Sequence, residues 1–120
     1  MTRVFLADAK FDARSAMRLL LKDMEMLVVG EAVDWPGAMA QIPAMMPDML
    51  VVDWELPAGI AAALALLRVS CPNLRVVVLS KQHDARQAAL HAGADAFIGI
   101  GELPDRVTEH LRAAAGDGRS

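Results

Sequence analysis

The chain has 120 residues, 55% of them apolar, and a formal net charge of −3, which is enough apolar material for the core of one compact domain. Asp, Pro or Arg interrupts every apolar run well short of the roughly 20 residues of a membrane span, and the cations form no basic stripe for a phosphate backbone. We therefore expect a cytoplasmic protein without signal peptide or membrane span that does not bind nucleic acid directly, and its single cysteine excludes an internal disulfide.

Five short apolar runs predict five β-strands. One of them, residues 49–52, is followed by Asp53 and a Pro/Gly turn, a pattern typical of a strand buried on both faces of a parallel sheet. The run with Gly30 and Glu31 is less apolar and is predicted to lie nearer an edge. In chain order, the predicted strands cover residues 4–7, 26–32, 49–53, 75–80 and 96–98.

Helical spacing of apolar residues predicts a helix after each strand. Asp12 and Asp34 are the expected N-caps of the first two helices, and Pro43 is expected to end or kink the second. Arg14 and Arg18 are placed on the outer face of the first helix. Gly93 is the expected C′ residue of the fourth helix. The predicted helices cover residues 13–24, about 35–43, 60–69, 84–92 and 104–114.

Strand and helix thus alternate five times, which predicts an α/β domain with a parallel sheet and right-handed crossovers. We predict a flavodoxin-like (βα)5 three-layer sandwich whose strands follow the order 2-1-3-4-5. The domain is expected to cover residues 1–115. Residues 116–120 are expected to form a flexible tail or the start of a linker.

Three of the predicted strands end in polar residues, Asp8, Asp53 and Ser80. In this strand order the three ends are neighbours, roughly 5 Å apart per step across the sheet. Two carboxylates that close repel each other unless a cation lies between them or one takes up a proton. Mg²⁺ prefers such oxygen ligands, and a neighbouring hydroxyl could bind a phosphoryl oxygen. The arrangement indicates phosphoryl transfer to Asp53 as the nucleophile.

The chain resembles the receiver domains of bacterial two-component response regulators, above all those that precede a helix-turn-helix DNA-binding domain. The resemblance implies that Asp53 is the phosphoacceptor, that Ser80 is the switch hydroxyl and that Phe97 is the aromatic residue that moves with it. It also implies that Asp8, Asp53 and the backbone carbonyl of Glu55 bind Mg²⁺. The matching segments are residues 6–8, 28–32, 47–53, 56–57, 76–80 and 92–97.

Two departures from the family pattern fall at the site itself. The family has two adjacent acids after its first strand, where this chain has Asp8 and Ala9, and a lysine after its fifth strand, where this chain has Ile100. A phosphoryl group adds close to two negative charges, and an unpaired buried charge costs on the order of 3–5 kcal/mol. We therefore expect Mg²⁺ binding and phosphorylation of Asp53 to be weak or absent. Lys81 and Glu55 could compensate in part, but solvent-directed side chains are the preferred expectation for both.

Three functions remain open. The preferred one is an atypical receiver that acts as a protein-interaction module, through its fourth helix, fifth strand and fifth helix, toward a signalling protein or as a homodimer. The second is a working receiver that takes phosphate from a histidine kinase and controls an output, transcriptional partner. The third, a phosphohydrolase using Asp53 and Glu55, is disfavoured by the short chain, so we predict no enzyme. Candidate docking residues are Arg86, Leu90, Phe97, Arg106 and His110.

Overall fold

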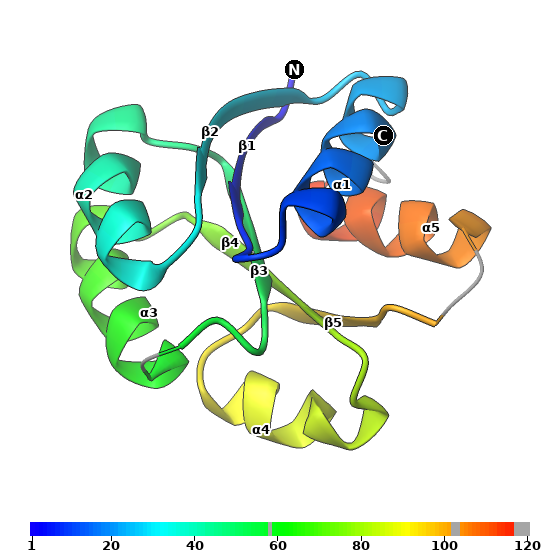
Figure 1. Cartoon of the computed structure of the whole chain (residues 1–120). Helices are drawn as coiled ribbons and strands as arrows, with labels where there is room; N and C mark the ends of the chain where they lie inside the picture. Colours follow the sequence, from blue (N-terminus) through cyan, green and yellow to red (C-terminus); the bar gives the residue numbers. More distant parts are fainter. Residues whose placement is uncertain (58, 102–103, 117–120) are drawn as a thin grey trace.

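In the computed structural model, five parallel strands form one sheet between two layers of helices (Figure 1). The structure describes residues 1–57, 59–101 and 104–116, so residues 117–120 of the predicted tail lie outside the described residues. The strand order is β2-β1-β3-β4-β5, which confirms the predicted flavodoxin-like fold and the edge position of β2. The strands are β1 (Arg3–Ala7), β2 (Leu27–Ala32), β3 (Met49–Asp53), β4 (Arg75–Ser80) and β5 (Ala96–Gly99).

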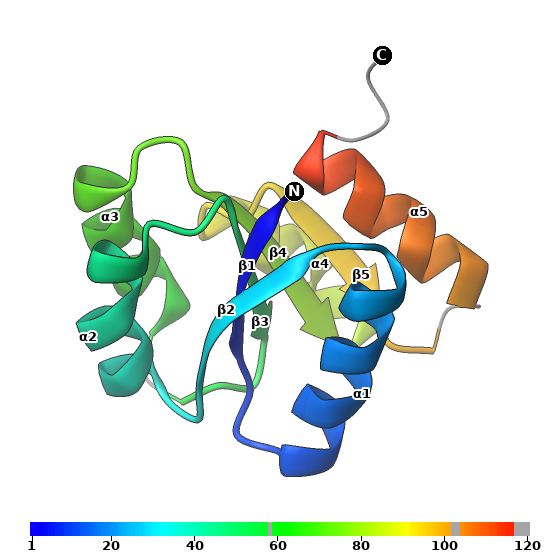
Figure 2. The ribbon, with the colours of Figure 1, turned by 90° about the horizontal axis from the view of Figure 1, so that it is seen from above.

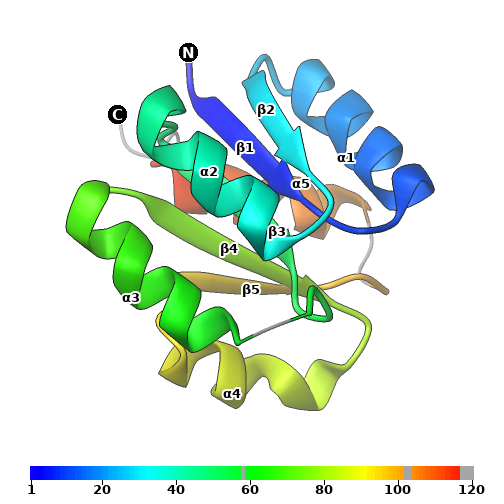
Figure 3. The same ribbon diagram turned by 60° about the vertical axis from the view of Figure 1, so that its left-hand side comes forward.

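Five α-helices cover the sheet. Figure 2 shows α1 and α5 on one side of the sheet, and Figure 3 shows α2, α3 and α4 along the other. None of the helices in the described ranges is long and apolar enough to cross a membrane. The helices are α1 (Phe11–Asp23), α2 (Trp35–Met45), α3 (Ile60–Ser70), α4 (Arg86–His91) and α5 (Pro104–Ala115), with a 3₁₀ turn at His83–Ala85.

The start of α1 differs from the prediction. Asp12 is not the N-cap, because the helix begins two residues earlier than predicted, at Phe11. Lys10 is the capping position, without a side-chain hydrogen bond. The carboxylate of Asp8 instead accepts a hydrogen bond of 2.8 Å from the backbone N–H of Lys10. The acid at the end of β1 thereby fixes the turn into α1, which leaves Asp12 within the first turn.

The ends of the other predicted helices agree more closely. Asp34 caps α2 as predicted, and its carboxylate accepts the N–H of Gly37 at 2.8 Å. Pro43 lies inside α2, which continues to Met45 and ends where Met46 adopts a left-handed backbone with φ of 48°. Proline removes one helical hydrogen bond and crowds the carbonyl four residues earlier, yet α2 continues for two residues beyond Pro43, so this residue does not end the helix. Gly93, with φ of 113°, follows the end of α4 as predicted.

Side chains alternate between the two faces of the sheet, and this alternation divides the core into two layers. Toward α2, α3 and α4 point the side chains of Phe5, Leu50, Val52, Val76, Val78 and Phe97. Toward α1 and α5 point those of Val4, Leu6, Val51, Val77, Leu79 and Ile98. The same alternation places Asp8 and Asp53 on the α1/α5 side of the sheet and Ser80 on the opposite side.

A charged network binds α1 to the sheet. Glu31 of β2 forms ion pairs with Arg14, at 3.2 Å, and with Arg18, at 2.6 Å. Arg14 also donates from Nη1 to the backbone carbonyl of Asp8 at 2.7 Å. The outer-face position predicted for Arg14 is therefore wrong, because the edge strand brings a carboxylate within its reach and leaves its side chain 14% exposed. The side chain of Arg18 remains 43% exposed.

A second network fastens the end of α3 to the start of β5. Arg68 donates to the backbone carbonyl of Gly93 at 2.8 Å and to the carboxylate of Asp95 at 3.0 Å. Asp95 also accepts the backbone N–H of Val76 at 2.7 Å, through the same oxygen. One guanidinium thus links the last turn of α3 with the loop that enters β5.

Candidate acidic site at the carboxyl ends of the strands

Asp8 and Asp53 lie side by side at the carboxyl edge of the sheet. Asp53 ends β3, Asp8 directly follows β1, and these two strands are hydrogen-bonded neighbours. The two residues are only 8% and 6% exposed, and both line the same hollow of about 440 Å³. Together with Ser80 they make up the buried polar residues of the described chain. The predicted proximity of the two carboxylates is therefore present.

Ser80 ends the neighbouring strand β4 and is completely buried. Its hydroxyl accepts the backbone N–H of Gln82 at 2.9 Å. Because strand alternation directs it toward the α2/α3/α4 layer, it is not among the residues that line the hollow around Asp8 and Asp53. The three strand ends are adjacent, but only the two carboxylates open into the same space.

The pKa of Asp8 is raised above its ordinary value of 3.8. Burial of the carboxylate is the largest cause, and the negative charge of Asp53 acts in the same direction. The hydrogen bond from the backbone N–H of Lys10 opposes this rise, as do the positive charges of Lys10 and Arg14. Ionisation of Asp8 is therefore less favourable in the folded protein than in water.

Asp8→Asn is expected to increase the free energy of unfolding at neutral pH. Since the folded-state pKa lies above 3.8, the folded protein binds this proton more readily than the unfolded chain, and ionisation of Asp8 destabilises the fold as pH rises above that value. Asparagine keeps the oxygen that accepts from Lys10 and has no charge. Urea denaturation from about pH 4 to pH 7 should show the difference between variant and wild type growing with pH. A difference that shrinks as pH rises would contradict this prediction.

The two candidate compensating residues occupy different places. Lys81 is exposed, but it lines the hollow together with Asp8, Asp53 and Ile100. Glu55 is exposed, does not line the hollow, and reaches Asp53 through its backbone N–H at 3.3 Å. No ion pair between Lys81 and Glu55 occurs in the part of the chain that the structure describes.

Arg14 is a site residue that the sequence pattern missed. Its side chain is 14% exposed and lines a narrow cavity together with Asp8 and Asp53. It is held there by Glu31 and by the backbone carbonyl of Asp8. The spacing of Arg14 and Arg18, one helical turn apart, together with an acid in an edge strand, is the signal that could have indicated this position.

The residues present fit a divalent cation only in part. Asp8 and Asp53 supply two carboxylates to one hollow, as a Mg²⁺ site requires. Within residues 1–57, 59–101 and 104–116, however, no three His, Cys, Asp or Glu side chains gather into a metal-binding group. Ala9, where a further acid would be needed, is exposed and offers no side-chain ligand.

The residues predicted to form a docking face differ in their exposure. Arg86, Leu90 and Arg106 are exposed, and His110 is half-buried. Phe97 is only 2% exposed and is covered by the Arg86 guanidinium, 5.2 Å from the ring centroid. The expectation that Phe97 contributes to the surface is wrong, because strand alternation directs its ring into the core.

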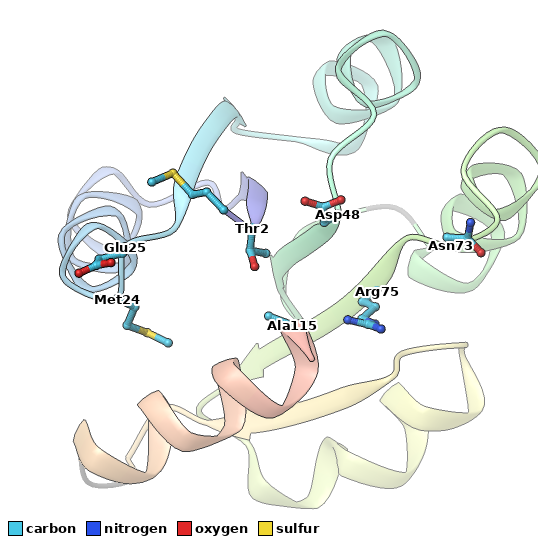
Figure 4. Close-up of a pocket in the computed structure, with 8 residues that line it drawn as sticks. Thr2, Met24, Glu25, Asp48, Asn73, Arg75 and Ala115 are labelled. Carbon is cyan, nitrogen blue, oxygen red and sulfur yellow. The ribbon is translucent and has the colours of Figure 1, made fainter. Parts of the chain in front are cut away.

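A further hollow, of about 540 Å³, lies at the opposite edge of the sheet (Figure 4). It is lined by residues at the amino ends of the strands, among them Thr2, Asp48 and Arg75, and by Ala115 at the end of α5. None of the predicted site residues lines it. This hollow is open to solvent and is lined by both acidic and basic side chains, so it indicates no particular chemistry.

A doubly wound parallel sheet in the order 2-1-3-4-5, with a buried carboxylate pair at its carboxyl edge, places the protein in the class of flavodoxin-like α/β domains whose sites lie at the carboxyl ends of the strands. The family model described as "Response regulator receiver domain" matches residues 4–111 of this chain. The chain therefore belongs to the response regulator receiver family, as the sequence resemblance predicted. It is the receiver domain of a two-component response regulator.

Curated relatives are longer proteins. The chain is 37% identical over 102 residues to the DNA-binding transcriptional activator DevR/DosR of Mycobacterium tuberculosis, covering 82% of this chain and 47% of that protein. It is 30% identical over 118 residues to the transcriptional regulatory protein YxjL of Bacillus subtilis, covering 94% and 54%. The chain thus spans about half the length of these two relatives.

Solved structures share the fold over nearly the whole chain. A receiver domain of a NarL response regulator from Mycobacterium tuberculosis superposes with a TM-score of 0.83 at 27% identity, covering 98% of both chains. The isolated receiver domain of RcsB from Salmonella enterica serovar Typhimurium, determined with the phosphomimetic BeF₃⁻, gives a TM-score of 0.84 at 21% identity, covering 99% of this chain and 91% of that one. At 21% identity the second likeness concerns the fold alone.

Proposed function

We propose that this receiver domain acts in two-component signalling as a protein-interaction module, with weak or no phosphorylation at Asp53. The observation that supports this most directly is the side chain of Ile100, 43% exposed, which lines the hollow around Asp8 and Asp53. An apolar group there cannot neutralise a phosphoryl group, which would add close to two negative charges beside Asp8. Ala9 lacks the carboxylate that would strengthen a metal site.

A working phosphoacceptor is the second candidate, and the position of Lys81 favours it. Lys81 lines the same hollow as Asp53, so its ammonium could pair with a phosphoryl group on Asp53 after a rotation of its flexible side chain. Asp53 would then be the phosphoacceptor, Ser80 the switch hydroxyl and Phe97 the switch aromatic. Asp8, Asp53 and the carbonyl of Glu55 would hold a weakly bound Mg²⁺, whose charge would offset that of the phosphoryl group.

We further propose that residues 1–115 form the receiver unit and that residues 116–120 begin a linker to an output partner in the cytoplasm. The lengths of the relatives support this arrangement, since DevR/DosR is described as a DNA-binding transcriptional activator. Other relatives are protein-glutamate methylesterases, such as the one from Myxococcus xanthus, 32% identical over 37% of its length. The match covers only that part of the relative, and we propose that the receiver unit itself is non-enzymatic. A histidine kinase is the proposed upstream partner.

The test is a titration with Mg²⁺ and then beryllofluoride, followed by tryptophan fluorescence. Trp54 adjoins Asp53, and Trp54→Phe separates its signal from that of buried Trp35. We expect no saturable change in the wild type at millimolar Mg²⁺, about the usual range for weak carboxylate sites. A saturable change that requires both ligands and is lost in Asp53→Asn would instead establish the working phosphoacceptor.

A further inference from the structure

An apolar groove of about 210 Å³ runs between α1 and the ends of β4 and β5. Ala13, Met17 and Leu20 form its wall on α1, and Leu79 and Ile100 form the facing wall. The α1 residues are spaced by three and four positions, which places them along one stripe of the helix. Asp8 is the single charged residue among those that line the groove in the described chain.

The carboxylate of Asp8 lies near the positive charges of Lys10 and Arg14 but forms no ion pair in the described ranges. It is 8% exposed and accepts a backbone hydrogen bond from Lys10 at 2.8 Å. None of the ion pairs found in the described ranges includes it, and Arg14 binds its backbone carbonyl rather than its side chain. Lys10 and Lys81 line the adjoining hollow but not this groove. A buried carboxyl group without an ion-pair partner therefore lines this apolar groove.

The occupant that complements this groove has a positive charge at one end and an apolar body. A charge-assisted hydrogen bond to a carboxylate is roughly twice as strong as a neutral one. Each methylene group removed from water strengthens binding by about 0.8 kcal/mol, or roughly fourfold. A fully polar cation would not displace water from the apolar walls, and a neutral apolar molecule would leave Asp8 without an ion-pair partner. Each should therefore bind more weakly than an amine with an apolar chain.

We propose that this groove binds a small organic amine in its ammonium form, with the ammonium at Asp8 and the apolar chain along Met17 and Leu20 toward Ile100. Binding of this kind does not require phosphorylation of Asp53, so the amine would regulate the domain independently of a kinase. The ligand would lie at the same edge of the sheet as the acidic site, where it would occupy the space next to Asp53.

The first experiment is a titration with n-hexylamine at neutral pH, followed by the backbone amide shifts of the labelled protein. We expect a saturable response confined to the neighbourhood of Asp8, Ala13, Met17 and Leu20. The matched probes are n-hexanol, which lacks the charge, and methylammonium, which lacks the apolar chain. Each is expected to bind at least about tenfold more weakly than n-hexylamine. Equal affinity for hexylamine and hexanol, or shifts scattered over the surface, would overturn the proposal.

Two variants test separately the contribution of the Asp8 charge and that of the apolar groove. Asp8→Asn should abolish the preference for hexylamine over hexanol while leaving hexanol binding unchanged. Ile100→Lys should abolish hexylamine binding, because its own ammonium competes for Asp8. Val69→Lys is the matched control, since Val69 is 81% exposed on α3, in the opposite helical layer. Retained selectivity in Asp8→Asn, or an equal loss of binding in both lysine variants, would contradict the proposal. The beryllofluoride result does not bear on any of these outcomes.

Discussion

The double variant Ala9→Asp/Ile100→Lys is expected to bind Mg²⁺ and beryllofluoride saturably where the wild type does not. The new carboxylate would follow Asp8 directly, and the new ammonium would line the hollow that already holds Asp8 and Asp53. Hydrogen bonds to charged groups contribute about 1.5–3 kcal/mol each. Two such groups should therefore raise the apparent affinity for the phosphoryl mimic by roughly a hundredfold or more. Fluorescence of Trp54 gives the measurement.

The matched control is Ala40→Asp/Val69→Lys, which makes the same change in net charge at two exposed positions away from the site. Its tryptophan fluorescence should show no saturable response to Mg²⁺ and beryllofluoride, as in the wild type. Addition of Asp53→Asn to the first double variant should remove its response. If Ala9→Asp/Ile100→Lys stays silent while it remains folded, the missing acid and lysine are not what limits the site, and the proposed basis for weak phosphorylation fails.

Gly30→Ala is expected to lower the free energy of unfolding by about 1–3 kcal/mol. At an unhindered position the same replacement would stabilise the fold, because alanine restricts the unfolded chain more than glycine does. A Cβ at Gly30 would lie 2.6 Å from Cε2 and 2.9 Å from Cδ2 of Phe5. The ring of Phe5 is completely buried and belongs to the α2/α3/α4 layer of the core, so it has no free space into which to move. Chemical denaturation measures the loss.

Gly101→Ala is the matched control for Gly30→Ala. A Cβ at Gly101 would have His83 Nε2 as its nearest neighbour, at 3.8 Å, which is an ordinary contact. Its effect should stay within about 0.5 kcal/mol. If Gly30→Ala proved as stable as Gly101→Ala, the close approach of β2 to Phe5 would not be a constraint on this fold.

The sequence predicted the fold well because its strands are short, continuous and bounded by turn residues. The apolar run that ends at Asp53 is buried along its whole length, as its composition indicated. The carboxylate pair followed from the same reasoning, since the carboxyl ends of neighbouring parallel strands meet at one edge. Local hydrogen bonding at Asp34 was predictable for a similar reason, because an N-cap depends on only four successive residues.

What escaped prediction depends on contacts between distant segments. The role of Arg14, on α1, requires Glu31 of the edge strand β2. The burial of Phe97 depends on which face of β5 its side chain takes. The irregularity in the β1–β2 pairing, where Val4 pairs with Val28 but Phe5 pairs with Gly30, places Gly30 against Phe5. Composition had suggested only that Gly30 marks an edge strand. Register of this kind is set by packing in three dimensions, which local sequence does not specify.

The attachment of Arg68 to Gly93 and Asp95 has a mechanical consequence. It fixes the loop that enters β5, together with the amino end of β4, to the last turn of α3. Strand β5 pairs with β4 along its whole length, and the N–H of Ile100 donates to the carbonyl of Ser80 at 2.8 Å, at the edge beside the two acids. The strand is thus held at both ends, by a side chain of α3 at one and by the backbone of β4 at the other. A displacement of β5 would have to break one of these two attachments.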